Sequence, residues 1–66
     1  MTGTIFQIWG KSTNCLIRGT DGVTYWSHVR DFPEPSIMKL GNLVQFRPKL
    51  ARIPGKHPPV TDVIAA

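Results

Sequence analysis

The sequence predicts an all-β domain built from five short strands. Six glycines and six prolines are spread along the whole chain and leave no long interval for a helix. The longest interval without either residue, VTYWSHVRDF (23–32), alternates with the period of two that is typical of strands. Short runs of this kind between regular turn signals indicate a small barrel or sandwich, and 66 residues suffice for one domain.

Turn signals divide the chain into these strands. Gly10 ends the first strand, and Asp21-Gly22 is a strong hairpin signal between the second and the third. Pro48 ends the fourth strand, because proline has no N–H to donate to a ladder. Pro59 at the start of the fifth indicates an edge strand. The predicted strands cover residues 3–9, 13–19, 22–29, 42–48 and 59–65.

The segment RDFPEPSIMKLG (30–41) joins the third strand to the fourth. Its length and its two prolines exclude a tight turn, so it predicts a crossover with a short 3₁₀ turn near Asp31–Phe32. Three strands, a crossover and two more strands fit a five-stranded antiparallel Greek-key OB-fold barrel. An SH3-like barrel also has five strands in about this length, and the strand spacing does not separate the two architectures.

The third strand carries large aromatic side chains on both of its faces. Alternation separates Thr24, Trp26 and His28 from Val23, Tyr25, Ser27 and Val29. Threonine and histidine are poor core residues and valine is a good one, which assigns Trp26 to the outer face. Tyr25 then points inward, where its hydroxyl needs a hydrogen-bond partner.

The first strand is apolar on both faces. Strict alternation places Ile5 and Trp9 on one face and Phe6 and Ile8 on the other. Trp9 would lie beside Trp26 only if the strand were shifted or bulged. We expect Leu16 and Met38 to add an apolar rim to the outer face. The residues expected to pack in the interior are Phe6, Phe32 and Phe46.

The charge distribution indicates an anionic partner. Eight Lys and Arg oppose four Asp and Glu, and the segment from Pro35 to Thr61 contains no acidic residue. A basic half in a small domain favours nucleic acid, whose single strands bind through ring stacking and phosphate contacts. The candidate phosphate contacts are Lys11, Arg18, Arg30, Arg47, Lys49, Arg52 and Lys56.

Several other function classes lack their signatures. Cys15 is the only cysteine, so the chain has no internal disulfide and no cysteine-based zinc site. Cys15 and His28 would be close on neighbouring strands, but no third group is evident to orient them for catalysis. No run approaches the roughly 18 apolar residues of a membrane span, and the N-terminus does not read as a signal peptide. We therefore expect a cytoplasmic protein that is not an enzyme and has no cofactor or membrane partner.

The order of landmarks along the chain resembles the bacterial cold-shock domain. The matching elements are Gly3, IFQIW, CLI, TDG, YWSHV, Gly41, LVQF, GKHP and TDV, and they cover nearly the whole sequence. The resemblance implies an OB-fold barrel that binds single-stranded RNA or DNA with low sequence specificity.

The resemblance also implies roles for individual residues. Trp26 falls where the family has a stacking phenylalanine, and His28 falls on its nucleic-acid-facing histidine. Pro58 matches a proline beside the binding face, whereas Asn14 and Leu16 occupy the places of two exposed phenylalanines. The candidate nucleic-acid-binding residues are Trp9, Lys11, Leu16, Arg18, Trp26, His28, Arg30, Lys56 and Pro58.

A protein-interaction module is the alternative function. An apolar-aromatic patch containing Leu16, Trp26 and Met38 would serve equally as an interface with a protein partner or with a second copy of the chain. The missing phenylalanines of the second strand favour this alternative, and the basic second half of the chain opposes it.

Overall fold

The computed structural model describes residues 1–49 and 57–66, and within them the five predicted strands are confirmed. Each strand begins and ends within two residues of its predicted bounds, and β4 ends at Pro48 as expected. The strands are β1 (Thr2–Trp9), β2 (Asn14–Gly19), β3 (Thr24–His28), β4 (Leu43–Pro48) and β5 (Val60–Ala65).

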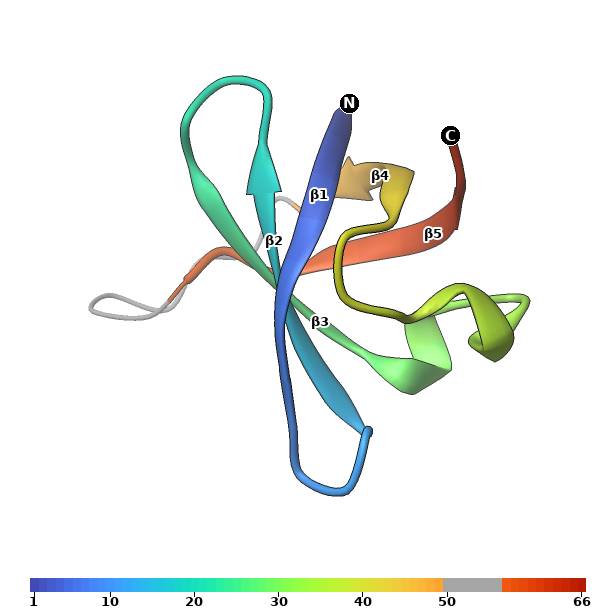
Figure 1. The fold of residues 1–66 in the computed structure, drawn as a ribbon. Helices are drawn as coiled ribbons and strands as arrows, with labels where there is room; N and C mark the ends of the chain where they lie inside the picture. The colour runs from blue at the N-terminus through green and yellow to red at the C-terminus, as the bar shows by residue number, and fades with distance from the viewer. Residues whose placement is uncertain (50–56) are drawn as a thin grey trace.

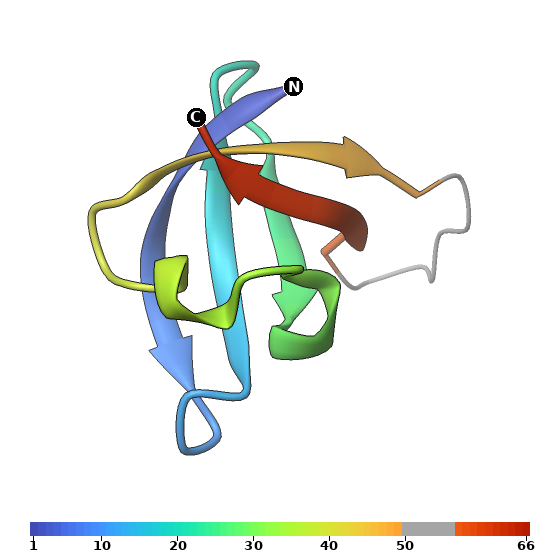
Figure 2. The same cartoon turned by 90° about the vertical axis from the view of Figure 1, so that its right-hand side faces the viewer.

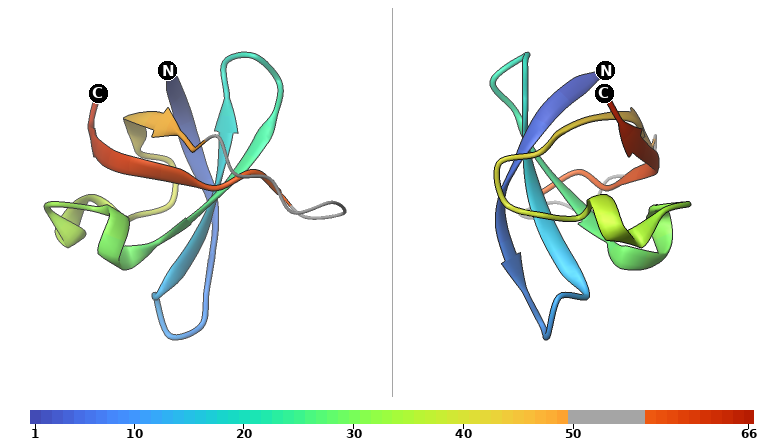
Figure 3. Two further views of the ribbon diagram at one scale, coloured as in Figure 1. Left: turned by 180° about the vertical axis from the view of Figure 1, so that it is seen from behind. Right: turned by 45° about the vertical axis from the view of Figure 1, so that its right-hand side comes forward.

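All five strands belong to one sheet in the order β3-β2-β1-β4-β5, and every pair of neighbours is antiparallel. The crossover after β3 contains two 3₁₀ turns, η1 (Val29–Asp31) and η2 (Pro35–Ile37), and it brings β4 back beside β1. The sheet is strongly curved, so that β4 and β5 run across β1, β2 and β3 (Figures 1 and 2). Both termini lie at the same end of the molecule (Figure 3).

The sheet is not closed by a continuous ladder. The free edge of β3 contacts the segment ahead of β5. There the backbone N–H of Trp26 donates to the Pro58 carbonyl oxygen at 3.0 Å. Trp26 and Pro59 also form an isolated parallel bridge. In the described residues, no helix is long and apolar enough to cross a bilayer.

The core lies between the β1–β3 layer and the β4–β5 layer. Tyr25 points inward as expected, and its ring lies 5.1 Å from that of Phe46. The Tyr25 hydroxyl donates to Asp21 Oδ2 at 2.7 Å, and this bond is the main reason why the pKa of Asp21 lies below its ordinary value. The buried apolar side chains are Ile5, Cys15, Ile17, Tyr25, Phe32, Met38, Val44, Phe46, Val60 and Val63.

The register of β1 contains a β-bulge. Ile5 and Gln7 pair with consecutive residues of β2, which leaves Phe6 as an extra residue. As a result, Ile5 is buried and Ile8, three positions later, also packs against the core. The bulge turns Trp9 to the outer face of the sheet. Trp9 therefore lies on the same face as Trp26.

A second bulge lies in β5. Between the pairs made by Gln45 and Arg47, β5 contains one more residue than β4. Asp62 has a left-handed backbone with φ of 53°, and it is the extra residue. Val60 and Val63, again three positions apart, are both fully buried.

Three sequence predictions for single side chains are wrong. Phe6 is 40% exposed, because the bulge turns it away from the core. Met38 is only 7% exposed and packs in the core, so it adds no rim to the outer face. Val23 is 41% exposed because it belongs to the β2–β3 turn, where its carbonyl accepts from the Gly19 N–H and its own N–H donates to Asp21.

Candidate functional site

The outer surface of β1, β2 and β3 brings most of the predicted site residues together. The β2–β3 register places Trp26 opposite Leu16 and His28 opposite Asn14. On the other side of β2, Gln7 lies opposite Leu16 and Trp9 lies opposite Asn14. We call this surface the aromatic face; it consists of Phe6, Gln7, Trp9, Asn14, Leu16, Arg18, Trp26 and His28.

Trp26 is held at its polar edge by a chain of hydrogen bonds. Its indole Nε1–H donates to Asn14 Oδ1 at 3.2 Å, and Asn14 Nδ2 donates to Thr13 Oγ1 at 3.0 Å. The Thr13 hydroxyl in turn donates to the Gly10 carbonyl oxygen in the β1–β2 turn. Trp26 is half-buried, and its polar edge is occupied by these partners.

Asn14 is therefore a site residue that the sequence prediction did not include. It occupies a position where the resemblance to cold-shock domains leads one to expect a ring, and it orients the neighbouring ring instead. Asparagine beside a β-hairpin turn gave no signal of this role, because the hydrogen bond joins residues 12 positions apart in the sequence.

Trp9 adds a second large ring to the aromatic face. It is 40% exposed and directly precedes the β1–β2 turn. In this turn Gly10, Lys11 and Ser12 all have a left-handed backbone, with φ of 67°, 56° and 65°. Lys11 is exposed in the turn next to Trp9, so a cation lies close in sequence to a ring.

Phe6 and Arg18 form a second pair on the face. The Arg18 guanidinium carbon lies 5.0 Å from the centre of the Phe6 ring, which is a cation–π distance. Arg18 is predicted as a phosphate contact, and the structure leaves it exposed. Phe6 was missed as a site residue because alternation assigned it to the interior. The spacing of Ile5 and Ile8 by three positions is the sequence signal that could have revealed it.

The ring of His28 is oriented by the turn that follows β3. Its Nδ1 accepts a hydrogen bond from the Arg30 backbone N–H at 3.1 Å, which leaves Nε2 as the ring nitrogen available to a ligand. The Asp31 carboxylate accepts from the backbone N–H of His28 at 3.0 Å and caps η1. Asp31 therefore contacts His28 through its backbone N–H.

Cys15 lies on the inner face of the same strands, away from His28. Cys15 is paired with Ser27 and buried, whereas His28 is on the outer face opposite Asn14. Cys15 and His28 therefore lie on neighbouring strands as predicted, but their side chains point to opposite faces of the sheet. Burial, with a smaller effect of the Asp31 charge, raises the pKa of the Cys15 thiol to about 11 and keeps it protonated at neutral pH. No group of three or more potential metal ligands occurs in residues 1–49 and 57–66.

The other residues predicted to contact nucleic acid lie outside the aromatic face or outside the described residues. Arg30 is exposed in η1 beside His28. Pro58 lies at the edge of β3 and accepts the hydrogen bond from the Trp26 backbone. Lys49 Nζ is 3.8 Å from Asp31 Oδ1, a long ion pair between an exposed ammonium and a largely buried carboxylate. Arg52 and Lys56 lie outside the described residues.

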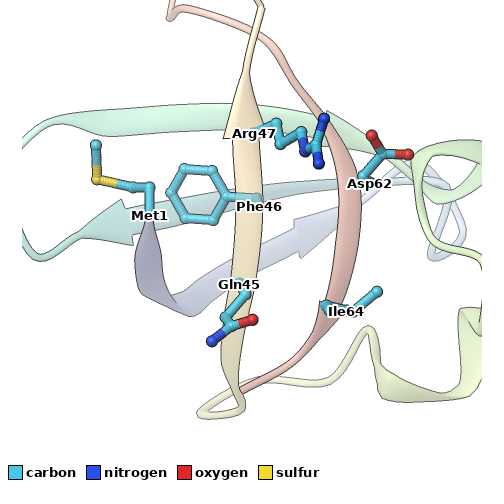
Figure 4. A pocket seen from close by; sticks show the side chains of 6 residues that line it. All are labelled: Met1, Gln45, Phe46, Arg47, Asp62 and Ile64. Atoms are coloured by element: carbon cyan, nitrogen blue, oxygen red, sulfur yellow. The ribbon is translucent and has the colours of Figure 1, made fainter.

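An open hollow of about 420 Å³ lies on the β4–β5 half of the molecule (Figure 4). Among the candidate binding residues that the structure describes, none lines this hollow, although Arg47 from the candidate phosphate contacts does. Figure 4 shows the Arg47 side chain extending toward that of Asp62. The lining residues are Met1, Gln45, Phe46, Arg47, Asp62 and Ile64.

Comparison with protein-family models gives no match, and no curated protein matches the sequence.

Proposed function

We propose that the protein binds single-stranded RNA or DNA with low sequence specificity through the aromatic face. The observation that carries the proposal is that Trp9 and Trp26 lie on the same outward face, with Arg18 on that face and Lys11 in the adjoining turn. Successive bases stack on such rings while cations contact the phosphates, and each stacked base contributes about 1–3 kcal/mol. The bulge in β1 is essential, because strict alternation would separate the two tryptophans.

The strand order supports a Greek-key barrel of the OB type, similar to the cold-shock domain. A fourth strand that returns to lie beside the first, giving the spatial order 4-1-2-3, is the Greek-key arrangement. The parallel bridge between Trp26 and Pro59 joins β3 to the start of β5 and supports a partly open barrel over an SH3-like one. OB barrels bind oligonucleotides on the β2–β3 surface and on the adjoining β1–β2 and β4–β5 loops. In a barrel of this type the aromatic face would be that surface.

The polar contacts of the face are consistent with sequence-tolerant stacking. The indole N–H of Trp26 is bound to Asn14 and does not compete for base edges, so the ring contributes its flat surface to a ligand. Every base has a flat π surface, so this mode of contact discriminates little between sequences. His28, opposite Asn14, offers a further flat group next to Trp26.

Fluorescence anisotropy with labelled oligo-U and oligo-dT tests the proposal at low and moderate salt. We expect binding to weaken with salt, with a log–log slope of about −2 to −3 for three or four phosphate contacts on a single strand. Trp26→Ala should lower the affinity by about 1–3 kcal/mol, or roughly 5- to 150-fold.

Val23→Ala is the matched control, because Val23 is an exposed apolar residue one position outside β3, in the turn. It should leave the affinity unchanged, and circular dichroism should show that both variants are folded. Absence of binding by the wild-type protein at concentrations of about tens of micromolar would contradict the proposal. Sedimentation at two concentrations tests the alternative: a self-associating species whose association requires Trp26 would favour a protein interface.

A further inference from the structure

Phe6 and Arg18 form a cation–π pair at one end of the aromatic face. Phe6 is the extra residue of the β1 bulge and has no partner in the β2 register, and its side chain is 40% exposed. Arg18 lies opposite Thr4 on β1 and Thr24 on β3, so its strand neighbours are small and uncharged. The guanidinium carbon lies over the Phe6 ring, 5.0 Å from the ring centre. The Phe6 ring is therefore the group against which the guanidinium rests.

The charge of Arg18 has no carboxylate partner within the described part of the chain. The only ion pair there joins Lys49 to Asp31. A guanidinium that lies against a ring keeps most of its five N–H donors, and a phosphate accepts two of them in a fork. Arg18 is thus held on the aromatic face and can still bind an anion.

We propose that Phe6 is a positioning residue, whose ring holds the Arg18 guanidinium in place to contact a phosphate of the bound strand. This inference rests on the proposed function and deepens it. A free exposed arginine loses side-chain rotamer freedom when it binds. The contact with the ring restricts these rotamers beforehand, and the affinity rises with the fraction of molecules already in the competent arrangement.

The strength of the contact sets an upper limit on the expected effect. An exposed cation–π contact shifts an equilibrium about two- to fivefold, so Phe6 can raise the affinity by no more than this factor. The whole effect should pass through Arg18. Phe6 differs in this respect from Trp9 and Trp26, whose rings would contact bases directly under the proposed function.

A double-mutant cycle with labelled oligo-U at low salt tests the inference. Phe6→Leu should lower the affinity by up to about two- to fivefold. In the Arg18→Gln background the same change should have no effect, because no guanidinium is left to position. Phe6→Tyr keeps an aromatic ring and should retain the wild-type affinity. Circular dichroism should show that all the variants are folded.

Trp9→Leu is the matched control, because Trp9 is equally exposed, at 40%, on the same strand. Trp9 lies opposite Asn14, which is four residues from Arg18 along β2, a distance of about 13 Å. The effects of changes this far apart usually add. Trp9→Leu should therefore lower the affinity by the same factor in the wild-type and Arg18→Gln backgrounds.

The proton resonances of the Arg18 side chain provide a readout that needs no ligand. In the free protein the ring current of Phe6 should shift them upfield. Phe6→Leu should remove this shift, and Phe6→Tyr should preserve it. Absence of the shift in the wild-type protein would overturn the inference, because the ring would then not hold the guanidinium in solution.

The binding outcomes separate the inference from the proposed function. If Phe6→Leu weakens binding equally in both backgrounds, Phe6 contacts the strand itself and its positioning role is overturned. If Phe6→Leu leaves the wild-type affinity unchanged, the role is also overturned, while nucleic-acid binding stands. If the wild-type protein binds neither oligo-U nor oligo-dT, the proposed function is contradicted and the inference falls with it.

Discussion

The strands β1 and β5 are both bulged, but the two bulges have different consequences. In each strand two apolar residues three positions apart face the core: Ile5 and Ile8 in β1, and Val60 and Val63 in β5. The extra residue of β1 is Phe6, whose backbone has an ordinary negative φ, whereas Asp62 in β5 adopts a left-handed conformation.

The outward residues of the two strands differ in chemistry. Beyond its bulge β1 presents Gln7 and Trp9 to a surface that already carries Trp26. The bulged part of β5 presents a carboxylate and Ile64 to an open hollow, whose described lining residues include no aromatic side chain apart from the buried Phe46. A bulge therefore enlarges an aromatic surface in β1 but not in β5, because the residues that follow the bulge differ.

The largest expected difference between the two regions concerns ligand binding. Trp9 and Ile64 are comparably exposed, at 40% and 47%, so truncating either should cost little stability. Trp9→Ala should lower the affinity for oligo-U or oligo-dT by about 1–3 kcal/mol, because it removes a stacking ring. Ile64→Ala should leave the affinity unchanged. Anisotropy titrations measure both variants, and equal losses for the two would refute the assignment of binding to the aromatic face.

A smaller difference is expected in the free energy of unfolding. Asp62→Val places a β-branched residue in a left-handed conformation and should destabilise the fold by about 1–2 kcal/mol. Asp62→Gly should not incur this cost, because glycine adopts a positive φ readily. Phe6 has an ordinary negative φ, so Phe6→Val causes no backbone strain of this kind. It should lower the free energy of unfolding by at most about 1 kcal/mol, through the lost contact with Arg18. Urea denaturation measures all three, and a larger loss for Phe6→Val than for Asp62→Val would contradict this account.

The strands themselves were predictable from the sequence because turn chemistry is local. Asp21-Gly22 and Pro48 determine where the chain turns or stops, and the structure agrees at both places. Alternation also predicted the inward position of Tyr25, whose hydroxyl finds its partner in Asp21. It failed for Val23, which lies in the turn, outside the strand.

The composition of the aromatic face was only partly predictable. A bulge inserts one residue without any compositional signature, so strict alternation assigned Phe6 to the interior and left the position of Trp9 dependent on the register. The i, i+3 spacing of aliphatic residues, seen at Ile5–Ile8, is the available signal, but short strands contain too few residues to distinguish it from chance. The role of Asn14 depends on a contact between strands, which no local pattern encodes.

The smallest expected difference concerns two exposed arginines, one in each region. Arg18 lies on the aromatic face against Phe6, and Arg47 lines the hollow with Asp62. If the phosphates follow the aromatic face, Arg18→Gln should reduce the magnitude of the log–log salt slope by about 0.7, the value for one contact on a single strand. Arg47→Gln should leave the slope unchanged, because a nearby carboxylate makes its surroundings less favourable to a phosphate. Titrations of both variants at four or more salt concentrations measure the slopes. A reduced slope for Arg47→Gln would mean that the bound strand also crosses β4, and that the two halves of the molecule share one binding surface.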